Sequence, residues 1–234
     1  MAKKLWVTMP SNWIHDGGLR EFRWTRVGEY RNAHKIAALQ LYIAISMTCE
    51  DMAVDWEDCY ASSVTYNKLQ VMTGLSRASV AGGLSLLEDM DVIKVVREGR
   101  KNYYIPKNYN GVNGWCKVPY RRLVNDEGQI IPFQAFKLRS VAELHALKLY
   151  LYLCYARPNK QHYTAASYEA INKATGIPEK MIPRAYTVLA GTGLLSHIDK
   201  GSDESVENKK MANAYYIKGY TDLIQRAAEA PATA

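Results

Sequence analysis

The sequence predicts an α+β protein, mainly α-helical, that consists of two tandem domains derived from an internal duplication. Three observations lead to this prediction. The chain has 234 residues and is 48% hydrophobic, which suffices for one or two cores. Apolar stretches of helical length are followed by short stretches rich in Tyr, Val and Ile, which are typical of strands. This series of stretches then occurs a second time, about 100 residues further along the chain.

The duplication is visible at five places that keep the same order. YNKLQVMTGLS from residue 66 aligns with YEAINKATGIP from residue 168, an offset of 102, and at that offset DVI at residues 91–93 meets GLL at residues 193–195. AALQLYIAI from residue 37 resembles HALKLYLYL from residue 145, and WVTMP from residue 6 resembles WCKVP from residue 115. NYYI from residue 102 matches AYYI from residue 214, an offset of 112, so this alignment gives the second copy ten extra residues. Asn and Gly in KNYNGVNGW mark a loop and divide the chain into domains 1–110 and 111–234.

Each copy is expected to contain the same elements in the same order. An extended N-terminal segment precedes a long apolar helix, and a short strand follows near YASSVT at residues 60–65 or HYTAAS at residues 162–167. Two helices come next, joined by the dipeptides Thr73-Gly74 or Thr175-Gly176. Two strands end the copy, and in the first copy they are VIKVVRE and KNYYI.

Two helices joined by a short turn and followed by a hairpin with a basic tip form the order of a winged helix-turn-helix. The residues that carry the resemblance to bacterial winged-helix proteins are Thr73, Gly74, Leu75, Ser76, Val80, Leu84, Leu87, Val92 and Ile93. The resemblance covers residues 63–105 and 167–217. Two such units in one chain resemble plasmid-type replication initiators. This resemblance implies sequence-specific binding of double-stranded DNA, with the second helix of each pair in the major groove.

The helix that starts at Ser76 has an unusual feature, because Gly82 and Gly83 stand in its middle, where each glycine disfavours the helix by about 1 kcal/mol relative to Ala. One hypothesis is that small residues on the outer face give clearance for DNA. The alternatives are close packing on a neighbouring helix, a dimer partner included, or simple tolerance. On the first hypothesis Ser76 caps the helix, Arg77 contacts a base edge, and the helix presents these residues to DNA: Ser76, Arg77, Ala78, Ser79, Gly82 and Gly83.

The two hairpins differ in charge. Residues 94–101 carry four basic side chains against one Glu, a net charge of +3, so Arg97, Arg100 and Lys101 are predicted to contact phosphates. Residues 199–210 carry three basic against four acidic side chains, a net charge of −1, which predicts a weaker contact. In the second copy Lys180 and Arg184 remain candidates for DNA binding, and Pro183 is compatible with the helix only in its first turn.

Composition and motifs predict that the protein is not an enzyme and has no cofactor or metal. The sequence lacks GxxxxGK[ST], GxSxG and HExxH, and Cys49, Cys59, Cys116 and Cys154 are too far apart for a structural zinc site. A net charge of +7 favours an anionic partner, and the absence of a long apolar run predicts a cytoplasmic protein without membrane contact. The expected partners are double-stranded DNA, further copies in a homodimer or higher assembly on DNA, and the replication or transcription machinery. A transcriptional regulator that binds an operator and a winged-helix protein-interaction scaffold are the alternatives.

Overall fold

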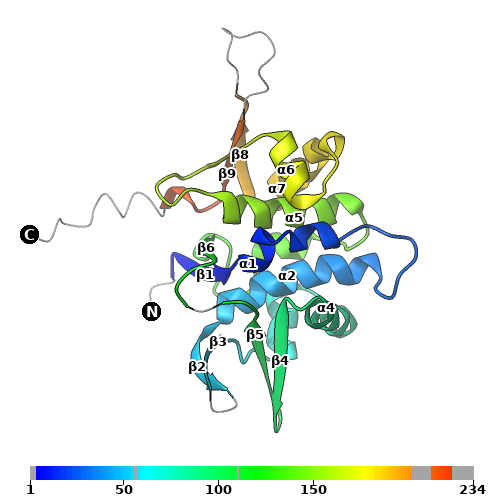
Figure 1. Ribbon diagram of the computed structural model, residues 1–234, viewed down its shortest axis with the longest axis vertical. Coiled ribbons are helices and arrows are strands. Elements are labelled where there is room, and N and C mark those ends of the chain that lie inside the picture. Colours follow the sequence, from blue (N-terminus) through cyan, green and yellow to red (C-terminus); the bar gives the residue numbers. More distant parts are fainter. Residues whose placement is uncertain (1–3, 55–56, 110, 202–211, 223–234) are drawn as a thin grey trace, which may run out of the picture.

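The computed structural model describes residues 4–54, 57–109, 111–201 and 212–222 and shows a mixed α+β protein. We refer to residues 4–109 as the first half and to residues 111–222 as the second half; each contains a strand, a long helix, a helix pair and a hairpin in that order (Figure 1). The elements of the first half are β1 (Trp6–Pro10), α1 (Asn12–His15), the 3-10 helix η1 (Gly18–Glu21), α2 (Asn32–Thr48), β2 (Glu50–Val54), β3 (Glu57–Ala61), α3 (Tyr66–Thr73), α4 (Arg77–Asp89), β4 (Ile93–Glu98) and β5 (Lys101–Pro106). Those of the second half are β6 (Trp115–Pro119), η2 (Ile131–Ala135), α5 (Val141–Ala156), β7 (Thr164–Ala166), α6 (Tyr168–Thr175), η3 (Glu179–Met181), α7 (Ile182–Thr192), β8 (Leu195–Asp199) and β9 (Asn213–Ile217).

The long helices α2 and α5 lie at the centre of the protein. Both are apolar around most of their circumference, which is typical of helices that are covered on all sides. The buried apolar side chains of the two halves form one continuous cluster around these helices. Every helix among the described residues is too short or too polar to traverse a lipid bilayer.

The turns of the two helix pairs are built by the same side chains in both halves. Thr73 closes α3 by donating its hydroxyl to the Leu69 carbonyl at 2.6 Å and accepting the Leu75 N–H at 3.3 Å. Gly74 follows with φ of 73°, a left-handed conformation that glycine adopts without strain. Thr175 and Gly176 repeat this arrangement after α6, with the Thr175 hydroxyl 2.6 Å from its carbonyl acceptor. The T-G dipeptides therefore mark the helix ends predicted from the sequence.

The hairpin strands pair as the sequence predicts, but with a different correspondence between the halves. Tyr104 pairs with Ser62 and Tyr215 with Thr164, and both tyrosines are buried. Tyr104 therefore corresponds to Tyr215, an offset of 111. The offset of 112 taken from the NYYI and AYYI matches is wrong by one residue. Side chains alternate between the faces of a strand, so a slip by one residue would have placed the buried tyrosine on the outer face.

The β2–β3 hairpin is an addition of the first half that the sequence analysis did not predict. Its strands pair from Glu50 opposite Ala61 to Val54 opposite Glu57. Only the end of β3 coincides with the strand expected at residues 60–65. In the second half, residues 157–163 alone connect α5 to β7. Residues 55–56, between β2 and β3 in the chain, lie outside the described residues.

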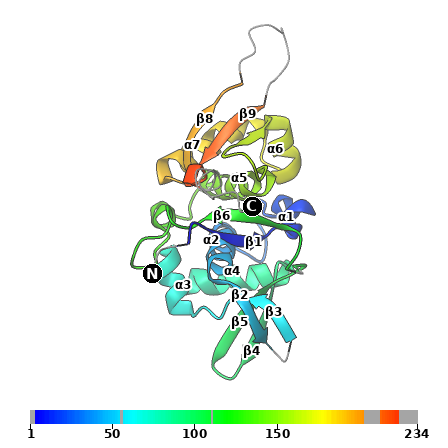
Figure 2. The ribbon, with the colours of Figure 1, turned by 90° about the vertical axis from the view of Figure 1, so that its left-hand side faces the viewer.

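The two halves are joined by their first strands. β1 and β6 lie side by side and antiparallel, with Trp6 opposite Pro119 and Pro10 opposite Trp115 (Figure 2). WVTMP and WCKVP are thus paired symmetrically, as two repeats related by a two-fold axis would be. The rings of Trp6 and Trp115 stack with centroids 5.9 Å apart, and the Lys117 ammonium lies 4.6 Å from the Trp6 ring.

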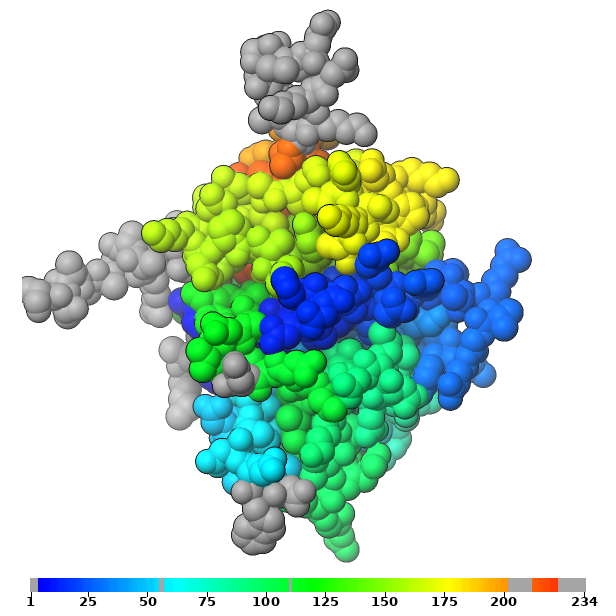
Figure 3. Space-filling model, in the orientation of Figure 1, coloured from blue at the N-terminus to red at the C-terminus, as the bar shows by residue number. Residues whose placement is uncertain are grey.

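The segment that follows each of these strands crosses to the other half. α1 contacts α5, η1 contacts α6, and this N-terminal segment lies across the boundary between the halves (Figure 3). In the opposite direction, the Met72 carbonyl at the end of α3 accepts the Ile130 N–H at 2.8 Å and the Gln134 side chain at 3.3 Å. Each half thus covers the helix pair of the other half, so separating the chain near residue 110 would expose both.

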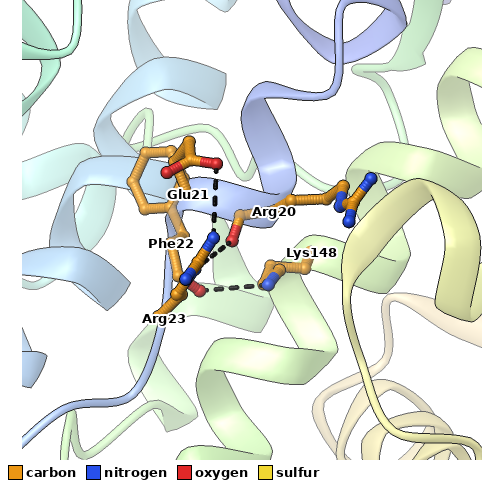
Figure 4. A network of polar contacts seen from close by, with 5 residues as sticks. All are labelled: Arg20, Glu21, Phe22, Arg23 and Lys148. Carbon is orange, nitrogen blue, oxygen red and sulfur yellow. Dashed lines mark hydrogen bonds and ion pairs between the residues drawn. The ribbon is translucent and has the colours of Figure 1, made fainter.

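A buried lysine fixes the N-terminal segment to the second half. Lys148 of α5 is 2% exposed, and its ammonium donates to the Phe22 carbonyl at 3.0 Å (Figure 4). Arg23 forms an exposed ion pair with Glu21 at 3.7 Å in the same segment. Burial, and next the neighbouring Arg23 guanidinium, lower the pKa of Lys148 from 10.5 to about 8.

Replacing Lys148 by Met should therefore change how stability depends on pH. Between pH 8 and 10.5 the unfolded chain holds the Lys148 proton more firmly than the folded protein, so raising the pH stabilises the wild type. The free energy of unfolding of the wild type should rise relative to that of Lys148→Met by roughly 1 to 3 kcal/mol from pH 7.5 to 10. Urea denaturation of both proteins across this range measures the difference, with the exposed Lys173→Met as the control. Parallel pH profiles for the wild type and Lys148→Met would contradict the assignment.

Candidate nucleic-acid interface

The helix α4 has one buried and one exposed face. The Ser76 hydroxyl caps it by accepting the Ser79 N–H at 3.2 Å, as predicted. Val80, Leu84 and Leu87 are buried, whereas the exposed face carries Arg77, Ala78, Ala81 and Ser85, with Ser79 half-buried at its edge. Apart from Arg77 at its start and the exposed Glu88 at its end, this face is made of small side chains, so another molecule can approach the helix backbone closely between them.

Gly82 and Gly83 do not belong to that face, and the interpretation that they give clearance for DNA is wrong. A Cβ atom on Gly83 would lie 2.6 Å from Leu41 Cδ1 and 3.0 Å from the Ala38 backbone nitrogen, and one on Gly82 would lie 2.6 Å from the His34 ring. Both glycines therefore allow α4 to pack closely on α2. This is the alternative of close packing on a neighbouring helix, here a helix of the same chain. Gly83 corresponds to Ala185 of α7, which is also small and fully buried.

Three of the predicted basic residues meet in one cleft. The cleft has a volume of about 330 Å³ and is lined by Ser63, Val64, Thr65, Tyr66, Asn67, Arg77, Arg100, Lys101 and Asn102. Arg77 reaches it from α4 and lies 5.3 Å from the Tyr66 ring, with its guanidinium 3.5 Å from Asn67 Oδ1. Arg100 and Lys101 reach it from the β4–β5 hairpin. A cleft with three cationic side chains suits the phosphates of a DNA strand.

The first turn of α3 forms the remaining wall of this cleft and was missed in the sequence analysis. Thr65 caps α3 by accepting the Lys68 N–H at 3.2 Å, and Tyr66 and Asn67 follow. The partial positive charge at the start of a helix favours a phosphate in the same way as the basic side chains do. The signal was present in the sequence as a Thr directly before the first helix of the pair.

The β4–β5 hairpin projects from one end of the molecule (Figure 1). Lys94, Arg97 and Arg100 are exposed along it, and Gly99 at its tip has φ of 58° with open space around it. The neighbouring β2–β3 hairpin carries the exposed residues Glu50, Glu57 and Asp58. The basic surface of the β4–β5 hairpin is therefore bounded by an acidic one.

A cleft of the second half lies beside α7 and the β8–β9 hairpin and contains one lysine, Lys200. It has a volume of about 250 Å³ and is lined by Tyr168, Tyr186, Ala190, Leu195, His197, Ile198, Lys200 and Asn213. At the offset of 102, Arg77 corresponds to Glu179 in η3. Lys180 and Arg184 are exposed, and Pro183 lies in the first turn of α7, where a proline is compatible with the helix. Lys209 and Lys210, two of the three basic residues counted for the second hairpin, lie outside the described residues.

Three of the four cysteines, Cys49, Cys116 and Cys154, are buried in the core, as are Tyr104 and Tyr215 of the two hairpins. All four cysteines are free, and burial raises the pKa of the Cys49, Cys116 and Cys154 thiols, which makes them poor nucleophiles. Tyr104 and Tyr215 are buried, and burial raises the pKa of each to about 12. Within the described residues, His, Cys, Asp and Glu side chains form no group of three or more that could hold a metal ion.

Comparison of the chain with protein-family models, with curated proteins and with solved structures found no match. The functional assignment therefore depends on the geometry of the surface around Arg77.

Proposed function

We propose that this protein binds double-stranded DNA sequence-specifically through two tandem winged-helix domains, and that it acts as a plasmid-type or phage-type replication initiator at origin repeats. The observation that carries the proposal is the cleft in which Arg77, Arg100 and Lys101 meet beside the exposed face of α4. The small residues of that face allow α4 to enter a major groove of the duplex. The three cationic side chains can then contact the phosphates on the edge of that groove.

The winged-helix interpretation is supported by the contacts that the halves share. Both contain the Thr-Gly turn between their helices, with the same side-chain hydrogen bonds. In both, a strand before the helix pair contacts the last strand of the hairpin, through Ser62 and Tyr104 or through Thr164 and Tyr215. A helix pair followed by a hairpin that projects beside it is the arrangement with which winged helices bind DNA.

The symmetric pairing of β1 with β6 supports a DNA site that spans two turns. The β4–β5 and β8–β9 hairpins lie at opposite ends of the longest axis of the molecule (Figure 1). Helices α4 and α7 can then enter successive major grooves about 10 bp apart on one side of the duplex. The site within one monomer should be asymmetric, because Arg77 corresponds to Glu179 and the two clefts differ in charge.

The first experiment is a selection of binding sites from a pool of random duplexes with the full chain. We expect an enriched asymmetric motif of roughly two turns that competes against unrelated duplex at physiological salt. Recovery of duplexes without a shared motif would remove the sequence-specific part of the proposal.

A second experiment separates replication from transcription. The gene and its flanking DNA are placed on a selectable plasmid that cannot replicate in the host, and a second plasmid carries the selected site within a promoter. Autonomous replication supports an initiator. Repression of the promoter without replication supports the alternative, a regulator that binds an operator.

The acidic β2–β3 hairpin is the observation that favours protein binding as an additional or alternative activity. Glu50, Glu57 and Asp58 are exposed on an element that the second half lacks. An acidic surface of this kind repels DNA and attracts basic proteins. If the chain fails to bind duplex DNA in the selection, the protein-interaction scaffold becomes the better hypothesis.

Substitutions in the β4–β5 hairpin should weaken duplex binding without changing which sequence is bound. Arg97→Ala and Arg100→Ala each remove one cation that faces the phosphates, so each should reduce the slope of log affinity against log salt by about one. Fluorescence anisotropy with the selected duplex and with an unrelated duplex, each at several salt concentrations, measures this. The exposed Lys173→Ala is the control, and an unchanged slope for both arginine variants would place the hairpin outside the interface.

A further inference from the structure

Four aromatic side chains form a cluster on the second half that the duplex site does not use. Tyr216 of β9 is at its centre, with its ring stacked on His197 of β8 at 4.0 Å and an interplanar angle of 14°. Tyr163 lies 5.5 Å and His162 5.4 Å from the same ring. We call these four residues the aromatic platform.

The aromatic platform is on the outer face of the sheet. In β9 the side chains of Tyr215 and Ile217 are buried, so Tyr216 between them points to the opposite face. His197 is exposed, and His162, Tyr163 and Tyr216 are partly exposed. The four rings therefore contact one another at the surface of the protein. Aromatic side chains usually contribute to stability by being buried, so a surface cluster of this kind is unusual.

In the first half, the surface that matches the aromatic platform faces the β2–β3 hairpin. With the offset of 111, Tyr216 corresponds to Ile105, which lines a cleft against Asp51, Met52 and Cys59 of the β2–β3 hairpin. The second half lacks a hairpin at this place, and its sheet face has aromatic rings there instead. The platform is therefore a property of the second half and not a requirement of the shared architecture.

The chemistry of the platform suits nucleic-acid bases. Exposed rings on a sheet bind bases by stacking, and the bases must be unpaired, because the base faces inside a duplex are already stacked on one another. Two lysines stand next to the platform in the chain: Lys160 precedes His162 by two residues, and Lys200 follows β8. Among the described residues of the same segment, Asp199 is acidic, and its carboxylate is engaged by the Tyr216 hydroxyl. Because residues 199–210 as a whole carry a net charge of −1, stacking on the rings, and not the charge of the hairpin, has to supply most of the affinity.

We propose that the aromatic platform binds single-stranded DNA by stacking unpaired bases on Tyr216, His197, Tyr163 and His162. This activity goes beyond the proposed duplex binding and uses different residues. The platform belongs to the β8–β9 end of the molecule, and the cleft around Arg77 belongs to the β4–β5 end (Figure 1). Loss of one activity can therefore be distinguished from loss of the other.

The test is the binding of the full chain to a fluorescently labelled 12-nucleotide oligothymidylate, measured by anisotropy. Wild-type protein should bind, and Tyr216→Ala should bind roughly tenfold or more weakly, with His197→Ala also weaker. Tyr216→Phe keeps the ring and should bind nearly as well as the wild type. Tyr103→Ala, which changes a partly exposed tyrosine of the first half, should bind normally.

Circular dichroism and thermal unfolding of each variant show whether it is folded. Substitution of thymine by 5-bromouracil adds a second readout, because irradiation should crosslink the oligonucleotide to peptides that contain Tyr216 or His197. Equal affinities of the wild type, Tyr216→Ala and His197→Ala would overturn the proposal. So would the absence of binding by the wild type, or crosslinks confined to the first half.

Discussion

Arg77→Ala is expected to lower the affinity for the selected duplex by roughly 5- to 150-fold at constant salt, which corresponds to about 1 to 3 kcal/mol. Arg77 is the only long side chain on the exposed face of α4 within its first turn, and its position over the Tyr66 ring and beside Asn67 holds the guanidinium near the cleft. Because a guanidinium that reaches a base edge discriminates between bases, the variant should also relax specificity at one position of the site. Anisotropy titrations with the selected duplex and its single-base variants measure both effects.

Two other arginines serve as controls for this prediction. Arg139→Ala removes an exposed arginine from the segment before α5 and should leave binding unchanged. Arg184→Ala changes the second half and should have a smaller effect than Arg77→Ala, since the cleft of that half contains a single lysine and Arg184 does not line it. An Arg184→Ala variant that loses all specificity while Arg77→Ala retains it would show that the two halves have been assigned the wrong roles.

Gly83→Ala is expected to destabilise the protein, although alanine is the better helix former. The added Cβ would lie 2.6 Å from Leu41 Cδ1 and 3.0 Å from the Ala38 backbone nitrogen, and that backbone belongs to the buried helix α2. Overpacking of this kind lowers stability by about 1 to 3 kcal/mol, which exceeds the gain of about 1 kcal/mol in helix propensity. Because the contact with the α2 backbone cannot relax easily, we expect a cost in the upper part of this range, and urea denaturation should show a net loss of up to about 2 kcal/mol.

Gly191→Ala is the matched control for this substitution. Gly191 also lies inside a helix, α7, but a Cβ atom there meets nothing within 4 Å. The substitution should raise the free energy of unfolding by about 0.5 to 1 kcal/mol through helix propensity. If Gly83→Ala stabilises the protein as much as Gly191→Ala does, α4 and α2 are not in the close contact described.

The sequence was sufficient to predict the long helices, the two helix pairs and the hairpin that follows each pair, because these depend on local patterns. The apolar spacing of Val80, Leu84 and Leu87 predicted α4, and the T-G dipeptides predicted the turns. The same spacing also indicated the role of Gly83, which is three residues after Val80 and one before Leu84 and so falls on the buried face. The hypothesis that glycine serves as a small surface residue placed Gly83 on the exposed face of α4, which is the wrong face.

Other features could not be predicted from local patterns. The acidic strands of the β2–β3 hairpin are rich in Asp and Glu, which are depleted in strands, so propensity argued against them. The contacts of Met72 with Ile130 and of Lys148 with Phe22 join residues that are 58 and 126 positions apart and depend on how the halves pack. The convergence of Arg77 with Arg100 and Lys101 likewise depends on the packing of α4 against the hairpin, although each residue had been a candidate.

Chemical footprinting of the full chain on its selected duplex tests the central proposal most directly. Hydroxyl-radical protection should extend over roughly two turns on one side of the duplex, and protection of guanine N7 from methylation should appear in two major-groove segments about 10 bp apart. In Arg77→Ala, methylation protection should disappear from one of these segments and remain in the other. Uniform protection along the duplex, or wild-type protection that Arg77→Ala leaves unchanged in both segments, would contradict the proposal that α4 contacts the major groove.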